Sequence, residues 1–246
     1  MSPELSVDVR LARAGGRDFS LEVAFTAPPG ITILFGPSGA GKSTTLSAIA
    51  GLARPESGRI ALGDDVWFDG ARDIDRPIHR RGIAFVFQSL ALFPHLTARA
   101  NVEYGIDRAL PRPARRQRAE EMLARMRVSH LAGRRPGTFS GGEGQRVALA
   151  RAFAMSPRVV LLDEPFSAMD RELRLQLAAD VRAYVDEAKL PLLHVTHHRN
   201  EARAMGDRAV LIEGGRVAAE GGIDELLPKL DDTLPIDVRP RSRREG

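Results

Sequence analysis

Cysteine is absent from the 246-residue sequence. Disulfides and cysteine-ligated metal sites are therefore excluded, which is compatible with the cytosol. No stretch of the sequence approaches the ~20 consecutive apolar residues of a membrane-spanning helix. The first residues also show no basic segment followed by an apolar one, as a secretory signal would. We therefore expect any role at a membrane to depend on a partner protein.

Lysine is scarce, since only Lys42, Lys189 and Lys229 occur and arginine supplies the rest of the positive charge. The net charge of +4 is modest. The only dense basic cluster, at 239–244, lies in an end segment (229–246) that we expect to be flexible and solvated. Attraction of this segment to anionic lipid at a cytoplasmic membrane face is an alternative. A nucleic-acid partner is not expected, because no aromatic residues interleave with the arginines.

The pattern of hydrophobic residues predicts an α/β fold. Alternating or continuous apolar runs predict strands, and these cover residues 5–11, 19–25, 31–35, 59–62, 66–68, 83–87, 159–162, 192–196 and 208–212. Helical spacing predicts helices over 114–126 and 142–155. We expect a core of parallel strands and helices, an attached antiparallel β part, and a helical subdomain inserted at about 91–157. One domain, 1–228, would contain all three.

A glycine-rich loop follows the buried strand 31–35 and predicts a phosphate-binding loop (P-loop). Its backbone N–H groups and the helix that it opens would surround an anion. The ammonium of Lys42 would reach the β- and γ-phosphates of a nucleotide, and the hydroxyl of Ser43 would ligate Mg²⁺. The predicted nucleotide-binding residues are Gly36, Pro37, Ser38, Gly39, Ala40, Gly41, Lys42, Ser43 and Thr44.

Two adjacent carboxylates end the apolar strand 159–162. Asp163 can hold Mg²⁺ through water, and Glu164 can orient or deprotonate an attacking water. Such a pair alone is more often a solvated turn. The buried strand before it and Pro165 after it favour a functional role, as in the Walker B strand of P-loop proteins.

The order of these motifs resembles the ATP-binding cassette of ABC transporters. The segment Ser140, Gly141, Gly142 is similar to the family's signature, which contacts the γ-phosphate held by an opposite subunit. Ser167 to Asp170 resembles the D-loop, which crosses the dimer interface. The resemblance implies a P-loop NTPase core in which two copies close around two ATP molecules with Mg²⁺.

Two further positions match this family. Gln88 corresponds to the Q-loop glutamine, which senses Mg²⁺ and meets the membrane partner. His197 corresponds to the switch histidine, which contacts the γ-phosphate. The resemblance thus implies catalytic roles for Glu164, His197 and Gln88, and a metal site of Ser43, Gln88 and Asp163.

The sequence departs from the family pattern at four positions near these motifs. Phe139 stands where leucine is usual, Glu143 where glutamine is common, Met169 where leucine is, and His198 where aspartate is. None of these changes removes a phosphate or metal contact. Phe19 is a candidate for the adenine-stacking aromatic residue, with core packing as the alternative.

Other P-loop classes fit less well. A GTPase should show an Asn-Lys-x-Asp guanine-binding motif, which is absent. A small-molecule kinase would lack the signature and the switch histidine. Chromosome-maintenance ATPases place long coiled coils between the P-loop and the Walker B strand, and the interval from Lys42 to Asp163 is too short for them. A tandem translation-type cassette would need a second copy of the cassette motifs, which is absent. A single cassette that dimerises and drives a separate membrane protein remains, with a soluble ABC-type ATPase as the alternative.

Several segments resemble the ATPases of molybdate importers. These are Phe35, the stretch 92–95, the stretch 101–105 and the signature. Importers of sulfate, iron(III), polyamines or sugars are close relatives. The resemblance implies a peripheral protein at the cytoplasmic face of the inner membrane, bound to permease subunits and served indirectly by a solute-binding protein. Leu92 and Phe93 would help to form the permease groove, with ordinary packing under a loop as the alternative.

Many molybdate ATPases carry an additional C-terminal oxyanion-binding β domain, for which we expect no room in this chain.

Overall fold

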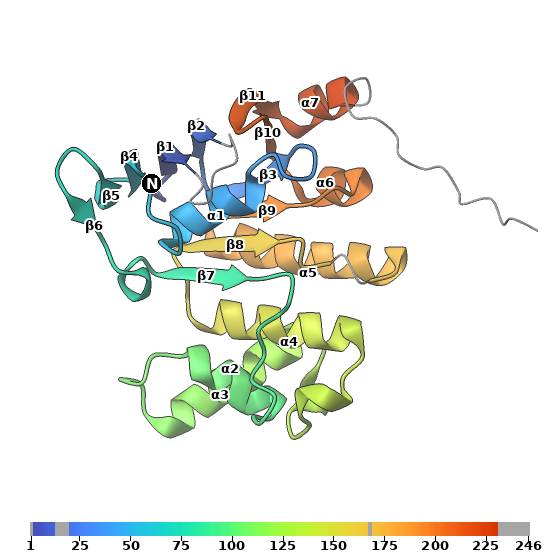
Figure 1. Ribbon diagram of the computed structural model, residues 1–246. Helices are drawn as coiled ribbons and strands as arrows, with labels where there is room; N and C mark the ends of the chain where they lie inside the picture. Colours follow the sequence, from blue (N-terminus) through green and yellow to red (C-terminus); the bar gives the residue numbers. More distant parts are fainter. Residues whose placement is uncertain (1, 13–19, 167–168, 231–246) are drawn as a thin grey trace, which may run out of the picture.

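The structure is a computed structural model that describes residues 2–12, 20–166 and 169–230. One sheet of eleven strands runs through it, in the order β6-β5-β4-β1-β2-β11-β10-β3-β9-β8-β7 (Figure 1). The strands are β1 (Leu5–Ala12), β2 (Ser20–Ala27), β3 (Gly30–Phe35), β4 (Ser57–Leu62), β5 (Asp65–Asp69), β6 (Ile74–Asp75), β7 (Ile83–Val86), β8 (Val159–Asp163), β9 (Pro191–Val195), β10 (Arg208–Glu213) and β11 (Arg216–Gly222).

The helices connect and cover this sheet. They are α1 (Lys42–Ala50), α2 (Ala98–Gly105), α3 (Arg112–Arg125), α4 (Gly141–Ala154), α5 (Arg171–Ala188), α6 (Arg199–Met205) and α7 (Ile223–Leu230), with 3₁₀ turns η1 (Ile78–Arg80), η2 (Ser129–Leu131) and η3 (Pro136–Thr138). No helix in the described part of the chain is both long enough and apolar enough to span a membrane.

The parallel half of the sheet consists of β10, β3, β9, β8 and β7, each paired in parallel with the next. This confirms the parallel core predicted from the apolar runs. Its strands are buried on both faces, as parallel strands usually are. Along β3, Ile33 and Phe35 point into the cluster formed with α4 and α5, while Leu34 points into the cluster formed with α1.

The antiparallel half consists of β1, β2, β4, β5 and β6. Leu5, Val7, Val9 and Leu11 of β1 are buried and the residues between them are exposed, which is the predicted period of two. This half does not pair directly with the P-loop strand β3. It joins through β11 and β10, so the sheet is continuous.

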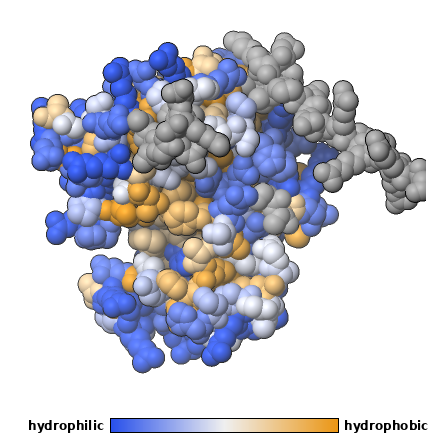
Figure 2. Space-filling view, in the orientation of Figure 1, coloured by the Kyte–Doolittle hydropathy of each residue, from blue (hydrophilic) through white to orange (hydrophobic). Residues whose placement is uncertain are grey.

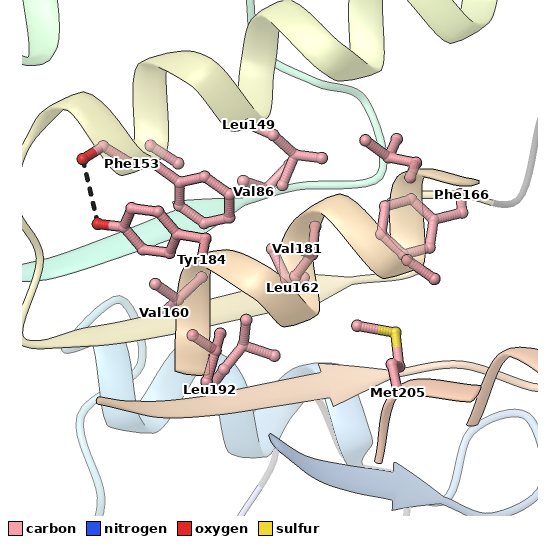
Figure 3. Close-up of a cluster of buried hydrophobic side chains, with 14 of the residues drawn as sticks. Val86, Leu149, Phe153, Val160, Leu162, Phe166, Val181, Tyr184, Leu192 and Met205 are labelled. Carbon is pink, nitrogen blue, oxygen red and sulfur yellow. Dashed lines mark hydrogen bonds between the residues drawn. The ribbon is translucent and has the colours of Figure 1, made fainter. Parts of the chain in front are cut away.

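Helices α4 and α5 pack against the same face of the parallel strands, and a hydrophobic cluster fills the space between the two helices and the sheet (Figure 3). The rings of Phe153 on α4 and Tyr184 on α5 stack with centroids 3.9 Å apart, and the Tyr184 hydroxyl donates to the Phe153 carbonyl at 3.3 Å. Helices α2, α3 and α4 pack on one another below the parallel strands in Figure 1. Helix α4 is therefore positioned by α2, by α3 and by the edge strand β7.

Candidate functional site

The phosphate-binding loop follows β3 directly and its backbone requires glycine. Gly36 has φ +144°, and a Cβ there would lie 2.0 Å from the carbonyl oxygen of Ile212 on β10. Gly41, with φ +108°, is the N-cap of α1, which begins at Lys42. Any larger residue at position 36 would force the loop away from the sheet. The loop is therefore fixed between the end of β3 and the start of α1.

Lys42 folds back over this loop. Its Nζ donates to the carbonyl oxygens of Gly36 at 2.8 Å and Pro37 at 2.9 Å. Burial lowers the pKa of the Lys42 ammonium, while the nearby carboxylates of Glu164 and Asp163 act to raise it. The ammonium is thus a cation in a partly dry site, where it attracts an anion more strongly than in bulk water.

Ser43 and Asp163 meet at the end of β8. The Ser43 hydroxyl donates to Asp163 Oδ1 at 3.0 Å. Burial raises the pKa of the Asp163 carboxyl, and the hydrogen bond from Ser43 opposes that shift. Hydroxyl and carboxylate oxygens are the hard donors that Mg²⁺ prefers, so this pair could hold that ion. Among the described residues, no cluster of three or more His, Cys, Asp or Glu side chains is arranged to hold a metal by itself.

Glu164 has an unusual backbone for its residue type, with φ +47°. Its N–H donates to the carbonyl oxygen of Val195 on β9 at 3.1 Å, which holds the residue in place. The Glu164 Oε2 lies 3.5 Å from Nδ1 of His197, which follows β9. Left-handed backbone at a non-glycine residue costs about 1–3 kcal/mol and occurs most often at functional sites.

A cavity of about 1000 Å³ brings most of these groups together. Its lining residues are Leu11, Leu21, Gly36, Ser38, Gly39, Gly41, Lys42, Ser43, Thr44, Ser47, Ala53, Arg54, Gln88, Glu164 and His197. Three predicted catalytic residues, Gln88, Glu164 and His197, therefore face the same space as the phosphate loop. Pro37 and Ala40 complete the loop without lining the cavity, and Asp163 reaches it through Ser43.

Sequence patterns did not identify five residues of this cavity: Leu11, Leu21, Ser47, Ala53 and Arg54. Leu11 and Leu21 belong to alternating strands, and their pattern indicates only that they face inward. Cross-strand pairing sets them opposite each other in β1 and β2. They give the cavity an apolar end away from the phosphate loop. Phe19, the candidate for adenine stacking, lies outside the described residues.

The signature residues do not line this cavity. Ser140 is the N-cap of α4, and its hydroxyl accepts from the Glu143 N–H at 3.3 Å, while the Ser140 N–H donates to Glu143 Oε2 at 2.7 Å. The latter hydrogen bond and one with His130 lower the pKa of the Glu143 carboxyl to about 2. Gly141 and Gly142 begin the helix.

Asp170 is also placed outside the cavity. It is the N-cap of α5, where its side chain accepts from the Leu173 N–H at 3.0 Å. The two D-loop residues Ser167 and Ala168 lie outside the described residues. The predicted residues thus form two separate groups, one around the cavity and one at the starts of α4 and α5.

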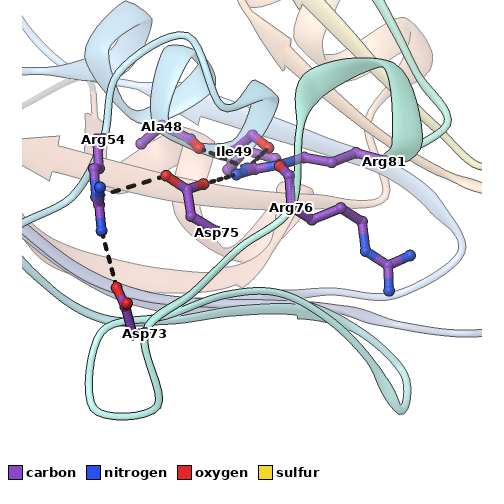
Figure 4. A network of polar contacts seen from close by, with 7 residues as sticks. All are labelled: Ala48, Ile49, Arg54, Asp73, Asp75, Arg76 and Arg81. Carbon is purple, nitrogen blue, oxygen red and sulfur yellow. Dashed lines mark hydrogen bonds and ion pairs between the residues drawn. The ribbon is translucent and has the colours of Figure 1, made fainter.

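The far end of α1 is held by a buried arginine (Figure 4). Arg81, on the chain after η1, is completely buried, and its guanidinium donates to the carbonyl oxygens of Ala48 at 3.1 Å and Ile49 at 2.7 Å. It also donates to the Arg76 carbonyl at 2.9 Å and to Asp75 Oδ1 at 3.1 Å. Because α1 starts at the phosphate loop, Arg81 ties that loop to the antiparallel half of the sheet.

The segment after Gln88 contains Leu92 and Phe93, which were expected to form part of a permease groove or to pack under a loop. Leu92 and Phe93 are half-buried, and Leu92 packs against the core of the helical part. The ring of Phe93 lies 4.4 Å from that of Tyr104, and the Arg151 guanidinium lies over it at 5.6 Å. This half-buried setting supports the alternative of packing under a loop, because α2 and α4 pack beneath both residues.

Exposed apolar side chains do occur nearby. Phe87, Tyr104 and Met155 have 37%, 56% and 43% of their surface exposed. In Figure 2, hydrophobic residues gather in a band across the middle of the visible face, between the strands and the lowest helices. An apolar surface therefore exists around the Q-loop segment, with Tyr104 as its most exposed large side chain.

Comparison with known proteins identifies the family of this chain. A family model described as ABC transporter matches residues 21–167. The chain belongs to the ABC transporter family. It is similar to the dimeric structure of MJ0796, a bacterial ABC transporter cassette, with a TM-score of 0.77, 30% identity, and coverage of 89% of this chain and 98% of that one. A post-hydrolysis state of that cassette bound to ADP and Pi gives a TM-score of 0.76. The predicted α/β cassette fold is confirmed.

Several curated relatives are named as molybdenum import ATP-binding proteins ModC. The one from Pseudomonas syringae pv. tomato is 42% identical over 95% of this chain and 60% of its own length. The one from Albidiferax ferrireducens is 40% identical over 94% of this chain and 62% of its own length. The chain therefore spans about 60% of the length of the curated relatives it matches.

Proposed function

We propose that this chain is the ATP-hydrolysing, nucleotide-binding subunit of an importer. Two copies would close around two ATP molecules and drive a separate membrane permease. One observation carries this proposal: Lys42, Glu164 and His197 share one cavity, while the signature residues from Ser140 to Gly142 lie outside it. The signature residues that would complete this ATP site then have to come from a second copy of the chain.

The chain's own residues divide the chemistry between them. Lys42 and the N–H groups of the phosphate loop hold the triphosphate. Ser43 and Asp163 would hold Mg²⁺, which when bound neutralises charge on the phosphates. Glu164 would accept a proton from the attacking water, and His197, with Nδ1 3.5 Å from Glu164 Oε2, would orient Glu164. The family resemblance adds a contact between His197 and the terminal phosphate. Gln88 faces the same space from the segment that leads to the helical part.

The helix α4 supplies the complementary surface. Its N-terminus carries free N–H groups and the Ser140 hydroxyl, a combination that favours an anion. Within one chain this surface contacts no part of the ATP cavity, so we infer that it faces the phosphates held by a partner cassette. The dimeric arrangement of the MJ0796 cassette supports this inference.

The ModC relatives support molybdate as the transported oxyanion. We propose that the chain acts at the cytoplasmic face of the inner membrane, on permease subunits served by a solute-binding protein. No residue of this chain is required to contact the transported solute. Uptake of isotopically labelled molybdate and sulfate by cells with and without this chain tests the substrate. Loss of sulfate uptake alone would reject molybdate.

The Glu164→Gln variant tests the dimer mechanism. Its amide cannot accept the proton, so ATP hydrolysis should fall at least ~10²-fold while ATP binding is retained. With ATP and Mg²⁺ present, the variant should migrate as a dimer in size-exclusion chromatography with light scattering. The Glu172→Gln variant, changed on the exposed face of α5, is the matched control and should behave as the parent chain does. A Glu164→Gln protein that binds ATP and stays monomeric contradicts the proposal.

A further inference from the structure

His194 is a histidine in the interior of the central sheet, and no step of the proposed ATP chemistry uses it. It lies on β9 between Ile33 of β3 and Leu162 of β8, and its side chain is completely buried. Its neighbours Leu192 and Leu193 are apolar, as is usual for a parallel strand. Burying an imidazole costs free energy unless its polar atoms are hydrogen-bonded. A specific partner therefore has to account for this residue.

That partner is Glu201 on α6, which is only 1% exposed. Burial would raise the pKa of the Glu201 carboxyl, but the hydrogen bond from His194 holds it below the usual value. Because an ionised carboxylate can only accept, Nε2 of His194 donates to Oε1 of Glu201. Nδ1 of His194 has no hydrogen-bond partner in the described part of the chain. The imidazole is therefore tied to Glu201 alone.

The segment 195–200, which these two residues enclose, contains His197. Within this segment the Val195 carbonyl accepts the Glu164 N–H at 3.1 Å, and Nδ1 of His197 lies 3.5 Å from Oε2 of Glu164. Glu164, His197 and Glu201 also line one narrow crevice. The hydrogen bond between residues 194 and 201 closes the segment into a loop and so restricts its conformations.

Arg174 on α5 faces the second oxygen of the same carboxylate. Its Nε lies 3.7 Å from Oε2 of Glu201, and neither atom has a hydrogen bond within the residues that the structure describes. The guanidinium also donates to the Met169 carbonyl at 2.7 Å, directly before Asp170 caps α5. Glu201 is thus held both from β9 and from the start of α5.

We propose that His194 and Glu201 are positioning residues for ATP hydrolysis: their hydrogen bond holds the segment 195–200 so that His197 stays beside Glu164. Neither side chain lines the ATP cavity, so both act through His197 rather than on the nucleotide. This role rests on the proposed function, because it requires that His197 and Glu164 act on ATP. The hold on the segment itself can be measured without nucleotide.

Two substitutions of His194 separate positioning from packing. His194→Leu suits an apolar strand but has no donor, whereas the amide of His194→Gln can still donate to Glu201. The kcat of His194→Leu should fall by about 10- to 100-fold, because a displacement of about 1 Å from the reactive geometry can cost that much. The kcat of His194→Gln should stay nearer that of the parent chain. The affinity for ATP should change little in either variant, because the phosphate loop is untouched.

Tyr184→Phe is the matched control. It also removes one buried donor, the hydroxyl that bonds to the Phe153 carbonyl, and it lies away from the ATP cavity. Tyr184→Phe should lower the Tm and leave kcat unchanged, measured at a temperature at which every variant is folded. If packing alone mattered, His194→Leu would be at least as active as His194→Gln. Equal kcat values for these two variants overturn the proposal.

Hydrogen–deuterium exchange without nucleotide tests the hold on the segment directly. Backbone amides of 195–200 should exchange faster in His194→Leu than in the parent chain or in His194→Gln, while those of α3 should not change. Unchanged exchange of 195–200 in His194→Leu also overturns the proposal. Faster exchange in a chain whose parent form does not hydrolyse ATP would reject the proposed function and still show that His194 holds this segment.

Discussion

Replacing Arg81 by alanine should destabilise the folded chain by about 3 kcal/mol. The side chain is fully buried and donates to three carbonyl oxygens and to Asp75. The Ala48 carbonyl keeps a second donor, the Gly51 N–H at 3.0 Å. The carbonyl oxygens of Ile49 and Arg76 would lose theirs, and an orphaned buried group costs about 1–3 kcal/mol. Asp75 adds little, because it is 35% exposed and keeps Arg54 at 3.6 Å.

Thermal unfolding measured without nucleotide is the appropriate assay, because a bound ligand would add its own stabilisation. For a chain of this size, 1 kcal/mol corresponds to about 2–4 °C in Tm, so the expected decrease is about 6–12 °C. Arg54→Ala is the matched control. Arg54 lies 3.6 Å from the same Asp75 but is 67% exposed, so its loss should cost no more than about 1 kcal/mol.

A second substitution tests the same geometry from the other side. A Cβ at Gly51, where φ is +82°, would lie 2.8 Å from Cζ of Arg81. Gly51→Ala should therefore be costly in the parent chain and less costly in the Arg81→Ala background, where only the backbone strain remains. Equal Tm decreases for Arg81→Ala and Arg54→Ala, or additive effects of Gly51→Ala and Arg81→Ala, would refute the reasoning.

Three further outcomes are expected. Lys42→Ala should weaken ATP binding by about 100-fold, since it removes a charged phosphate contact; unchanged affinity in fluorescence titration would contradict the P-loop assignment. The Glu143 carboxyl has a pKa of about 2 against an ordinary 4.5. The ionised carboxylate therefore stabilises the folded chain above about pH 4.5, and this contribution is lost as the pH falls toward 2. In urea titrations, the difference in unfolding free energy between the parent chain and Glu143→Gln should disappear over that interval. Charge at Phe93 or at the exposed Tyr104 should leave basal ATP hydrolysis intact but abolish co-purification with the permease, because an apolar docking surface tolerates no charge at its centre. Charge at Leu92, which packs against the core cluster, should in addition lower the Tm in thermal unfolding.

The phosphate loop and the carboxylates Asp163 and Glu164 were predictable because each follows a continuous apolar run. Such a run can only be a buried strand or helix, and the glycines after the first one fix a turn. The parallel strands were predictable for the same reason. The short strand β6 and the polar-alternating β11 carried no comparable signal, since Arg216–Gly222 has no buried apolar run.

Side-chain contacts between distant segments were not predictable. Arg81 is one of many arginines in the sequence, and only the tertiary fold shows that it is buried against α1. The burial of Leu92 was not predictable either, because the core cluster that it packs against is formed by residues far from it in the sequence. The separation of Ser140 from Lys42 likewise follows from helix packing and not from local sequence.

The backbone of Glu164 has an evolutionary consequence. At φ +47° glycine would be the more comfortable residue, and asparagine is tolerated there more readily than most. The backbone conformation at this position therefore disfavours glutamate, so stability alone would not retain the carboxylate. A duplicated copy of the gene that no longer needed to hydrolyse ATP could exchange Glu164 for glycine and gain stability. Substitution of Glu164 in such a copy would then indicate that ATPase activity has been lost while the fold is retained.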